Sequence, residues 1–218
     1  EPELNAIDTK MENANEMTGN NYMIDEYWDG YGIVVAVLDT GLNVEHEAFQ
    51  DAMGYAEYYG VLTEEAVAAA DTWEKGKYVS AKIPFAYDYA EDDDDVTDYN
   101  GHGTHVSGTA VGIAATETED GGYEVSFCGA SPAAQLLSMK IFMDEDGGTS
   151  SDIYFYALED AYELGVDVVN MSIGAQNGFT YDDSLETEVF GNIYKRLSDA
   201  GVILSIAAGN EYSMAYFS

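Results

Sequence analysis

The chain has little cysteine, little positive charge and no long apolar run. Its 218 residues include one cysteine, Cys128, so no disulfide can form within the chain. No run of about 18 apolar residues occurs, which predicts that there is no transmembrane segment. Seven Lys and Arg stand against 42 Asp and Glu, giving a formal net charge of −35. A field of this sign excludes nucleic acid and anionic membranes as partners, and it favours cationic peptides and cations.

Proline is also scarce, with 3 residues, whereas 46% of the residues are hydrophobic and 22 are glycine. This balance is typical of a globular chain with one sizeable core. Residues 1–20 are polar and acidic, unlike a secretory leader, so we expect that any leader has already been removed. We predict an entry segment, extended or loosely helical, over residues 1–27 and one domain over residues 28–218.

Apolar runs alternate with amphipathic stretches along most of the chain. The apolar runs predict buried strands at 33–38, 81–87, 135–142, 166–173 and 202–207. The apolar spacing and the small residues predict helices at 63–70, 102–112, 151–164 and 184–200. The alternation predicts an α/β fold, a parallel β-sheet with helices on both faces. In such sheets, functional sites lie beyond the carboxyl ends of the strands.

Side chains suited to acyl transfer occur where these predicted elements begin or end. Asp39 follows the first strand, His102 begins a helix, and Asn210 follows the last strand. A serine hydroxyl becomes a nucleophile when a neutral imidazole takes its proton and a buried carboxylate holds that imidazole in one tautomer. An amide side chain can donate a hydrogen bond to the oxyanion that then develops. The sequence therefore predicts an acyl-transfer site at the carboxyl edge of the sheet.

Three motifs that carry these residues resemble the subtilisin-like serine proteases. They are Asp39-Thr40-Gly41, the run His102 to Gly108, and Ala208-Gly209-Asn210. Three such motifs in this order on a parallel sheet make a specific signal, whereas each alone is weak. The resemblance implies a serine endopeptidase in which Asp39 is the buried acid, His102 the general base and Asn210 the oxyanion-hole amide. It also implies that His105 is a structural residue on the helix of His102.

The resemblance implies a substrate groove as well. Ser172, Ile173 and Gly174 match the strand that pairs with substrate backbone and lines the primary specificity pocket. Gly147 and Gly148 match the facing segment. Acidic residues at 144–146 adjoin these glycines, which predicts a preference for Lys or Arg two to four residues before the cleaved bond. The chemistry requires no cofactor, and the acidic segments 91–95 and 117–120 predict a structural calcium ion in a loop.

The chain departs from the family at the nucleophile. Ser213 is followed by Met-Ala but lacks the family's preceding Gly-Thr and following Pro, and it lies three residues after Asn210. We expect the nucleophilic serine to lie beyond residue 218, so the fold is incomplete at its C-terminus and this chain alone is inactive. The unpaired sheet edge then predicts self-association or association with the missing C-terminal half.

The long spacer between Asp39 and His102 resembles the bacterial cell-envelope proteinases of the lactocepin and complement-cleaving type. This resemblance implies protein or peptide substrates and a secreted or cell-surface location. Three alternatives stay open at this point. The first is a non-catalytic binding module on a subtilisin-like scaffold, and the second is an acidic calcium-binding surface protein. The third is a zinc site on His102, His105 and Cys128, which is an incomplete ligand set.

Overall fold

The computed structural model describes residues 14–25, 28–72, 75–145, 147–173 and 186–207. Their main sheet consists of strands in the order β2-β5-β1-β6-β7, and each neighbouring pair is parallel. The strands are β1 (Val34–Asp39), β2 (Phe85–Asp88), β5 (Gln135–Lys140), β6 (Val168–Met171) and β7 (Ile203–Ile206). The predicted α/β fold class is confirmed. In this described part, no helix has the length and apolarity needed to cross a membrane.

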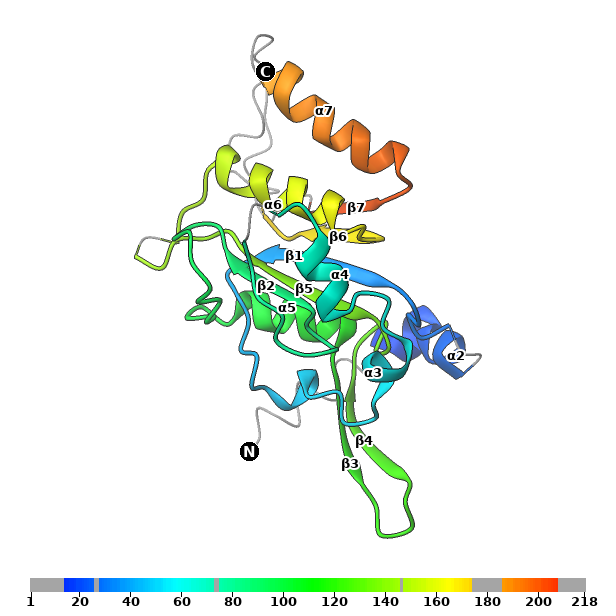
Figure 1. The fold of residues 1–218 in the computed structure, drawn as a ribbon. Coiled ribbons are helices and arrows are strands. Elements are labelled where there is room, and N and C mark those ends of the chain that lie inside the picture. The colour runs from blue at the N-terminus through cyan, green and yellow to red at the C-terminus, as the bar shows by residue number, and fades with distance from the viewer. Residues whose placement is uncertain (1–13, 26–27, 73–74, 146, 174–185, 208–218) are drawn as a thin grey trace, which may run out of the picture.

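Helices cover both faces of this sheet (Figure 1). α6 (Ser151–Glu163) and α7 (Glu186–Asp199) lie on one face, and α5 (His102–Val111) lies on the other. Alternate residues of β1 enter two separate cores. Leu38 packs in the core that includes α6 and α7, whereas Val37 packs in the core that includes Val111 of α5. Burial on both faces explains the continuous apolar run of β1, because neither side of that strand meets water.

Local sequence signals set where several elements begin and end. Thr63 caps α4 (Glu64–Ala69), and its hydroxyl accepts a hydrogen bond from Ala66 N at 3.2 Å. Gly165 and Gly201, with φ of 68° and 87°, follow α6 and α7 in the left-handed conformation that favours glycine. The predicted strand 81–87 is shorter than expected and begins at Phe85, directly after Pro84, which has no N–H to donate.

A β-hairpin that the sequence analysis did not predict projects from the body of the molecule (Figure 1). It consists of β3 (Ile113–Glu117) and β4 (Tyr123–Cys128), which pair antiparallel with a register shift at Ala114/Ala115. Its signal was the alternation of Tyr123, Val125 and Phe127 after a Gly-Gly turn. The hairpin is largely exposed, so it carries no long apolar run.

The remaining short elements surround the sheet. They are the helix at 14–18, α2 (Asn20–Asp25), the 3₁₀ turn η1 (Glu47–Phe49) and α3 (Tyr55–Tyr59). The entry segment is therefore helical where it is described. Among the described strands, β2 and β7 lie at the two edges of the main sheet, and Ile203 and Ile206 of β7 are exposed.

Candidate active site

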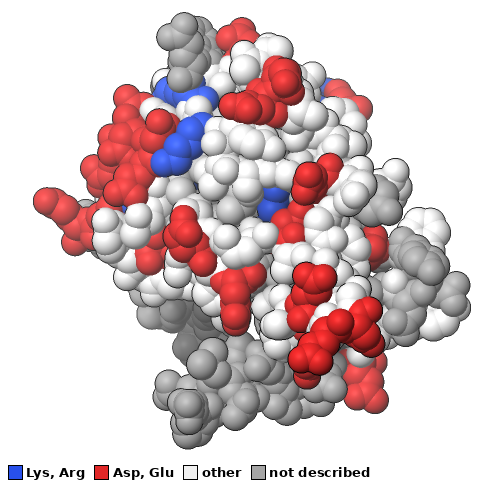
Figure 2. All heavy atoms as spheres, turned by 60° about the horizontal axis from the view of Figure 1, so that its bottom comes forward, with Lys and Arg blue, Asp and Glu red and all other residues white. Residues whose placement is uncertain are grey.

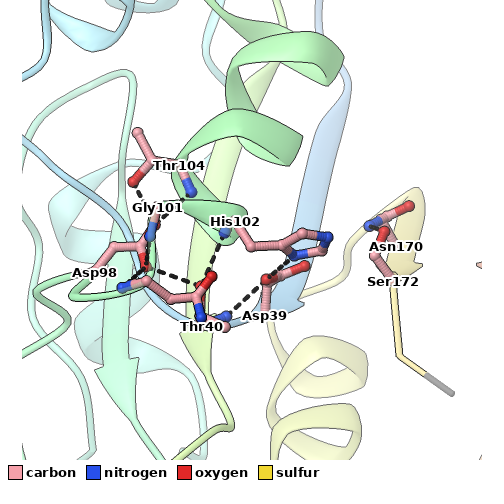
Figure 3. Close-up of polar contacts among 10 residues, drawn as sticks. Asp39, Thr40, Asp98, Gly101, His102, Thr104, Asn170 and Ser172 are labelled. Atoms are coloured by element: carbon pink, nitrogen blue, oxygen red, sulfur yellow. Dashed lines mark hydrogen bonds and ion pairs between the residues drawn. The ribbon is translucent and has the colours of Figure 1, made fainter. Parts of the chain in front are cut away.

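The end of β1 and the start of α5 place Asp39 against His102 (Figure 3). The Nδ1 atom of His102 lies 2.7 Å from Oδ1 of Asp39, and the same oxygen accepts a hydrogen bond from Thr40 N at 2.8 Å. The Asp39 side chain is 1% exposed, whereas that of His102 is 49% exposed. When the carboxylate is ionised and the imidazole is neutral, the proton resides on Nδ1, and Nε2 is left as the hydrogen-bond acceptor.

Two glycines let the strand end and the helix start approach this closely. Gly41 has φ of 119°, and a Cβ there would lie 2.5 Å from Val96 O. A Cβ at Gly103 would overlap the carbonyl oxygen of Gly41 and would lie 3.2 Å from Asp39 Cβ. Both positions therefore require glycine: a side chain at Gly41 would push away the segment 96–98, and one at Gly103 would push the helix start away from the carboxylate.

Asp98 organises the loop that leads into α5 (Figure 3). Its Oδ1 accepts hydrogen bonds from Thr40 Oγ1 and Gly101 N, both at 2.8 Å. Its Oδ2 accepts from Thr104 N at 2.8 Å and from Thr104 Oγ1 at 2.7 Å. Thr40 Oγ1 in turn accepts from Gly103 N at 2.9 Å, so this network joins the end of β1 to the first turn of α5.

The same contacts set the charge of Asp98. Burial alone would raise the pKa of this carboxyl group, but the hydrogen bonds from Thr104, Gly101 and Thr40 lower it below its usual value. Asp98 therefore remains ionised and holds the loop firmly. The sequence analysis did not single out Asp98, and it named Thr40 only as part of the motif with Asp39 and Gly41. The available signal was an Asp three residues before a glycine at a helix start, which is typical of a side chain that caps its own turn.

A cavity of about 530 Å³ lies beside His102. Its lining includes Thr40, Tyr99, Asn100, His102, Phe142, Met143, Asp144, Gly147, Ser172 and Ile173. The structure thus brings four of the residues singled out from sequence to one groove, namely His102, Ser172, Ile173 and Gly147. Gly148 lies in the same turn as Gly147, and its carbonyl accepts a hydrogen bond from Met143 N at 2.9 Å. Gly174, Asn210 and Ser213 lie outside the described residues.

The exposed side of His102 faces the strand end that carries Ser172 (Figure 3). Ser172 Oγ accepts a hydrogen bond from Asn170 Nδ2 at 2.9 Å. Within the described ranges, no hydroxyl group is hydrogen-bonded to the imidazole, whose recorded partner is Asp39. The Nε2 side of the ring is therefore directed at the groove, where a general base must meet its proton donor.

Metal binding has no ready-made site in the part of the chain that the structure describes. No group of three or more His, Cys, Asp or Glu side chains there is placed to hold an ion. His105 is exposed, and no such cluster joins it to His102 and Cys128. In the acidic segment 91–95, Asp92 already bonds Lys75 Nζ at 2.9 Å and Tyr87 Oη at 2.8 Å.

Comparison with known proteins shows which family the sequence resembles. The sequence profile of the subtilase family matches residues 30–216. The chain is 31% identical over 203 residues to the PI-type proteinase of Lactococcus lactis subsp. cremoris, an overlap that covers 90% of this chain and 10% of that protein. It is 33% identical over 185 residues to a C5a peptidase of Streptococcus pyogenes serotype M3, which covers 84% of this chain and 15% of that protein.

Solved structures show the same architecture. The S41 psychrophilic protease matches with a TM-score of 0.53 at 27% sequence identity, covering 84% of this chain and 47% of that chain. A cold-adapted subtilisin-like serine proteinase has the same TM-score at 24% identity and shares the fold. The chain thus belongs to the subtilase family of serine peptidases. It spans about half the length of these solved relatives and 10% to 15% of the two curated ones.

Proposed function

We propose that this chain supplies the acid and the base of a serine endopeptidase that hydrolyses peptide bonds. The observation that carries the proposal is the 2.7 Å contact between His102 Nδ1 and the buried Asp39 carboxylate, with the opposite side of the ring facing a groove. A binding module has no need for an imidazole fixed in one tautomer, whereas a general base does. This geometry therefore favours catalysis over the non-catalytic alternative.

The proposed mechanism assigns one step to each group. His102 Nε2 takes the proton of a serine hydroxyl as that oxygen attacks the substrate carbonyl carbon, and Asp39 stabilises the imidazolium that forms. The side-chain amide of Asn210 donates a hydrogen bond to the oxyanion, a type of contact worth about 10²–10³ in turnover. His102 then returns the proton to the leaving amine. The acyl-enzyme is hydrolysed by water in the same way, with His102 again acting as the base.

We propose that the nucleophile is a serine beyond residue 218, so that residues 1–218 alone are inactive. Ser213 follows Asn210 too closely for intervening strands to place it. Ser172 Oγ is engaged by Asn170. The longer protein that carries this serine is referred to below as the serine-bearing protein.

The proposed substrate is an extended polypeptide held as an extra strand between residues 172–174 and 147–148. Main-chain hydrogen bonds supply the affinity and side-chain pockets supply the specificity. Figure 2 shows acidic side chains spread over the face in view with few basic ones, in keeping with the net charge of −35. Such a field attracts cationic substrates. We further propose a secreted or cell-surface location in a bacterial envelope, no cofactor for the chemistry, and a structural calcium ion.

The test compares hydrolysis of a chromogenic peptide by the serine-bearing protein and by residues 1–218. We expect turnover by the first protein alone, and we expect His102→Ala to lower it by about 10⁴–10⁶, since triad members act as a unit. His46→Asn is the matched control, because this exposed histidine caps η1 through a hydrogen bond from Ala48 N that asparagine can also accept.

Full turnover by the His102→Ala variant of the serine-bearing protein would contradict the proposal. Peptide binding without hydrolysis by the wild-type serine-bearing protein would instead identify a binding module. Turnover by residues 1–218 that disappears in Ser213→Ala would show that Ser213 is the nucleophile.

A further inference from the structure

Three charged residues form one row across the carboxyl end of the sheet. The register of β1 and β5 pairs Asp39 with Lys140, and the register of β2 and β5 pairs Lys140 with Asp88. Residues paired in register on neighbouring parallel strands direct their side chains to the same face of a sheet. Lys140 therefore lies between the candidate catalytic acid and a second buried carboxylate.

Lys140 is buried and forms ion pairs with two carboxylates. Its Nζ lies 2.8 Å from Asp88 Oδ2 and 2.7 Å from Asp144 Oδ1. The side chains of Lys140 and Asp88 are each 1% exposed, whereas that of Asp144 is 37% exposed. Burial would lower the pKa of Lys140, but its bonds to Asp144 and Asp88 raise it above its usual value, so the ammonium group stays charged.

Asp144 and its surroundings belong to the groove beside His102. Asp144 and Tyr99 both line this groove, and Lys140 Nζ lies 5.5 Å from the centre of the Tyr99 ring. Asp144 also begins a tight turn. Met143 N donates to Gly148 O at 2.9 Å, and Gly147 N donates to Met143 O at 3.0 Å. Lys140 therefore connects the buried end of the sheet to the turn that forms one wall of the groove.

We propose that Lys140 is a positioning residue for substrate binding, which it serves by holding Asp144 and the neighbouring residues Met143, Gly147 and Gly148 against the groove. The proposal rests on the proposed endopeptidase function. It has two physical parts. The ion pair limits the movement of the wall that faces Ser172 and Ile173, and it compensates the charge that Asp144 presents to a substrate. Charge compensation also weakens the negative potential of Asp144, on which the expected preference for Lys or Arg depends.

The two carboxylates that share Lys140 provide a matched pair of variants in the serine-bearing protein. Asp144→Asn and Asp88→Asn each remove one of the two negative charges that pair with the ammonium group of Lys140. Asp88 differs in that it is buried and is not among the residues that line the groove. For Asp144→Asn, we expect KM to rise by about fivefold with kcat within about twofold, the size of one partly exposed charged contact. For Asp88→Asn, we expect a lower melting temperature with KM within about twofold, because Lys140 retains Asp144.

Substrate charge gives a readout that a purely structural role would not change. We compare kcat/KM for peptides with Lys or Glu at two to four residues before the cleaved bond, at low salt. Lys140→Met frees the charge of Asp144, so the Lys-to-Glu ratio is expected to rise by about fivefold. Asp144→Asn is expected to lower that ratio, and Lys140→Arg to restore the wild-type value.

The outcomes separate this inference from the proposed function. Loss of all hydrolysis in the wild-type serine-bearing protein contradicts the proposed function. Normal hydrolysis with equal KM changes in Asp144→Asn and Asp88→Asn, or with no change in either, overturns the role of Lys140 alone. If Lys140→Met does not fold, the two asparagine variants still decide the matter, since each keeps Lys140 paired with one carboxylate.

Discussion

The carboxyl end of the main sheet has two corners, one at the end of β1 and one at the end of β2. Each is formed around a buried carboxylate, and the two carboxylates have different partners. At the first corner, Asp39 bonds to His102, whose side chain is about half exposed. At the second corner, Asp88 bonds to Lys140, which is fully buried, and its other oxygen accepts from Ala90 N at 2.8 Å and Glu91 N at 3.0 Å. Both carboxylates pair in register with Lys140. The comparison teaches that the partner decides what a buried carboxylate does: one orients an imidazole that is half open to the groove, whereas the other pairs with a buried ammonium group and serves structure.

Replacing the carboxylate by an amide at each corner is expected to give the largest difference between the two. In the serine-bearing protein, Asp39→Asn is expected to lower kcat by about 10⁴, because an amide can no longer hold His102 in the tautomer that leaves Nε2 free. Asp88→Asn is expected to keep kcat within about threefold. Steady-state kinetics on folded protein, with folding checked by circular dichroism, measures both. Equal losses in the two variants would mean that the corners do not differ in kind.

A third buried carboxylate, Asp160, sharpens the comparison because its described hydrogen-bond partner is a neutral hydroxyl. Tyr89 Oη donates to Asp160 Oδ2 at 2.7 Å. Burial raises the pKa of Asp160 to about 6, although the bond from Tyr89 opposes the shift. The folded state therefore binds the proton more tightly than the unfolded state, and stability falls as pH rises from about 4 to about 6.

Asp160→Asn removes this titration while leaving an oxygen to accept the bond from Tyr89. We expect the variant to be more stable than wild type at pH 7 by about 3 kcal/mol, with no difference near pH 3. Urea denaturation of both proteins at pH 3, 5 and 7 measures the difference. A constant difference across this range would show that Asp160 does not carry the proton.

Lys82 provides the smallest effect and a contrast to Lys140. Both lysines are fully buried, but Lys82 Nζ donates to two carbonyl oxygens, of Pro132 at 2.7 Å and of Ala134 at 2.6 Å. Burial lowers the pKa of Lys82 to about 8, with Asp51 opposing the shift. Between about pH 8 and 10 the folded state therefore binds fewer protons than the unfolded state, so this group adds stability as pH rises.

We expect the stability of wild type relative to Lys82→Met to increase by about 1 kcal/mol between pH 8 and 9. The difference between the two proteins isolates Lys82 from the tyrosines that also titrate at high pH. Thermal unfolding at both pH values measures it. A relative stability that falls over this interval would contradict the lowered pKa.

The sequence predicted secondary structure best where burial produces a regular pattern of apolar residues. Strand β1 was predictable because its residues alternate between two cores, which produces an unbroken apolar run up to Asp39. Strands β5 and β6 follow the same alternation but include polar residues such as Ser138 and Asn170. Asp39 and His102 were predictable from short motifs at element ends. The hairpin β3–β4 was not recognised, because half-exposed strands carry a weaker signal. The catalytic and substrate-binding roles of all the predicted site residues, Asp39 and His102 included, stay predictions.

Features that depend on distant contacts were harder to predict. Lys140 belongs to an apolar run, and a lone cation in a buried strand was a signal that some partner must exist. Its partners, Asp88 and Asp144, lie 52 residues before it and 4 residues after it, as the residue numbers show. Only the register of β2 against β5 brings Asp88 to it. The bonds of Asp98 across to Thr40 likewise require the strand end and the helix start to be placed first.

The backbone contact between Gly41 and Gly103 has a consequence for engineering this protein. Because a side chain at Gly103 would overlap the Gly41 carbonyl, the spacing of strand and helix is fixed by main-chain atoms. Volume-conserving exchanges of apolar core side chains are usually tolerated and do not touch this contact, so they are the safer place to seek heat or solvent tolerance. The glycines themselves offer no such freedom. A library of variants of this protein should therefore leave positions 41 and 103 unchanged.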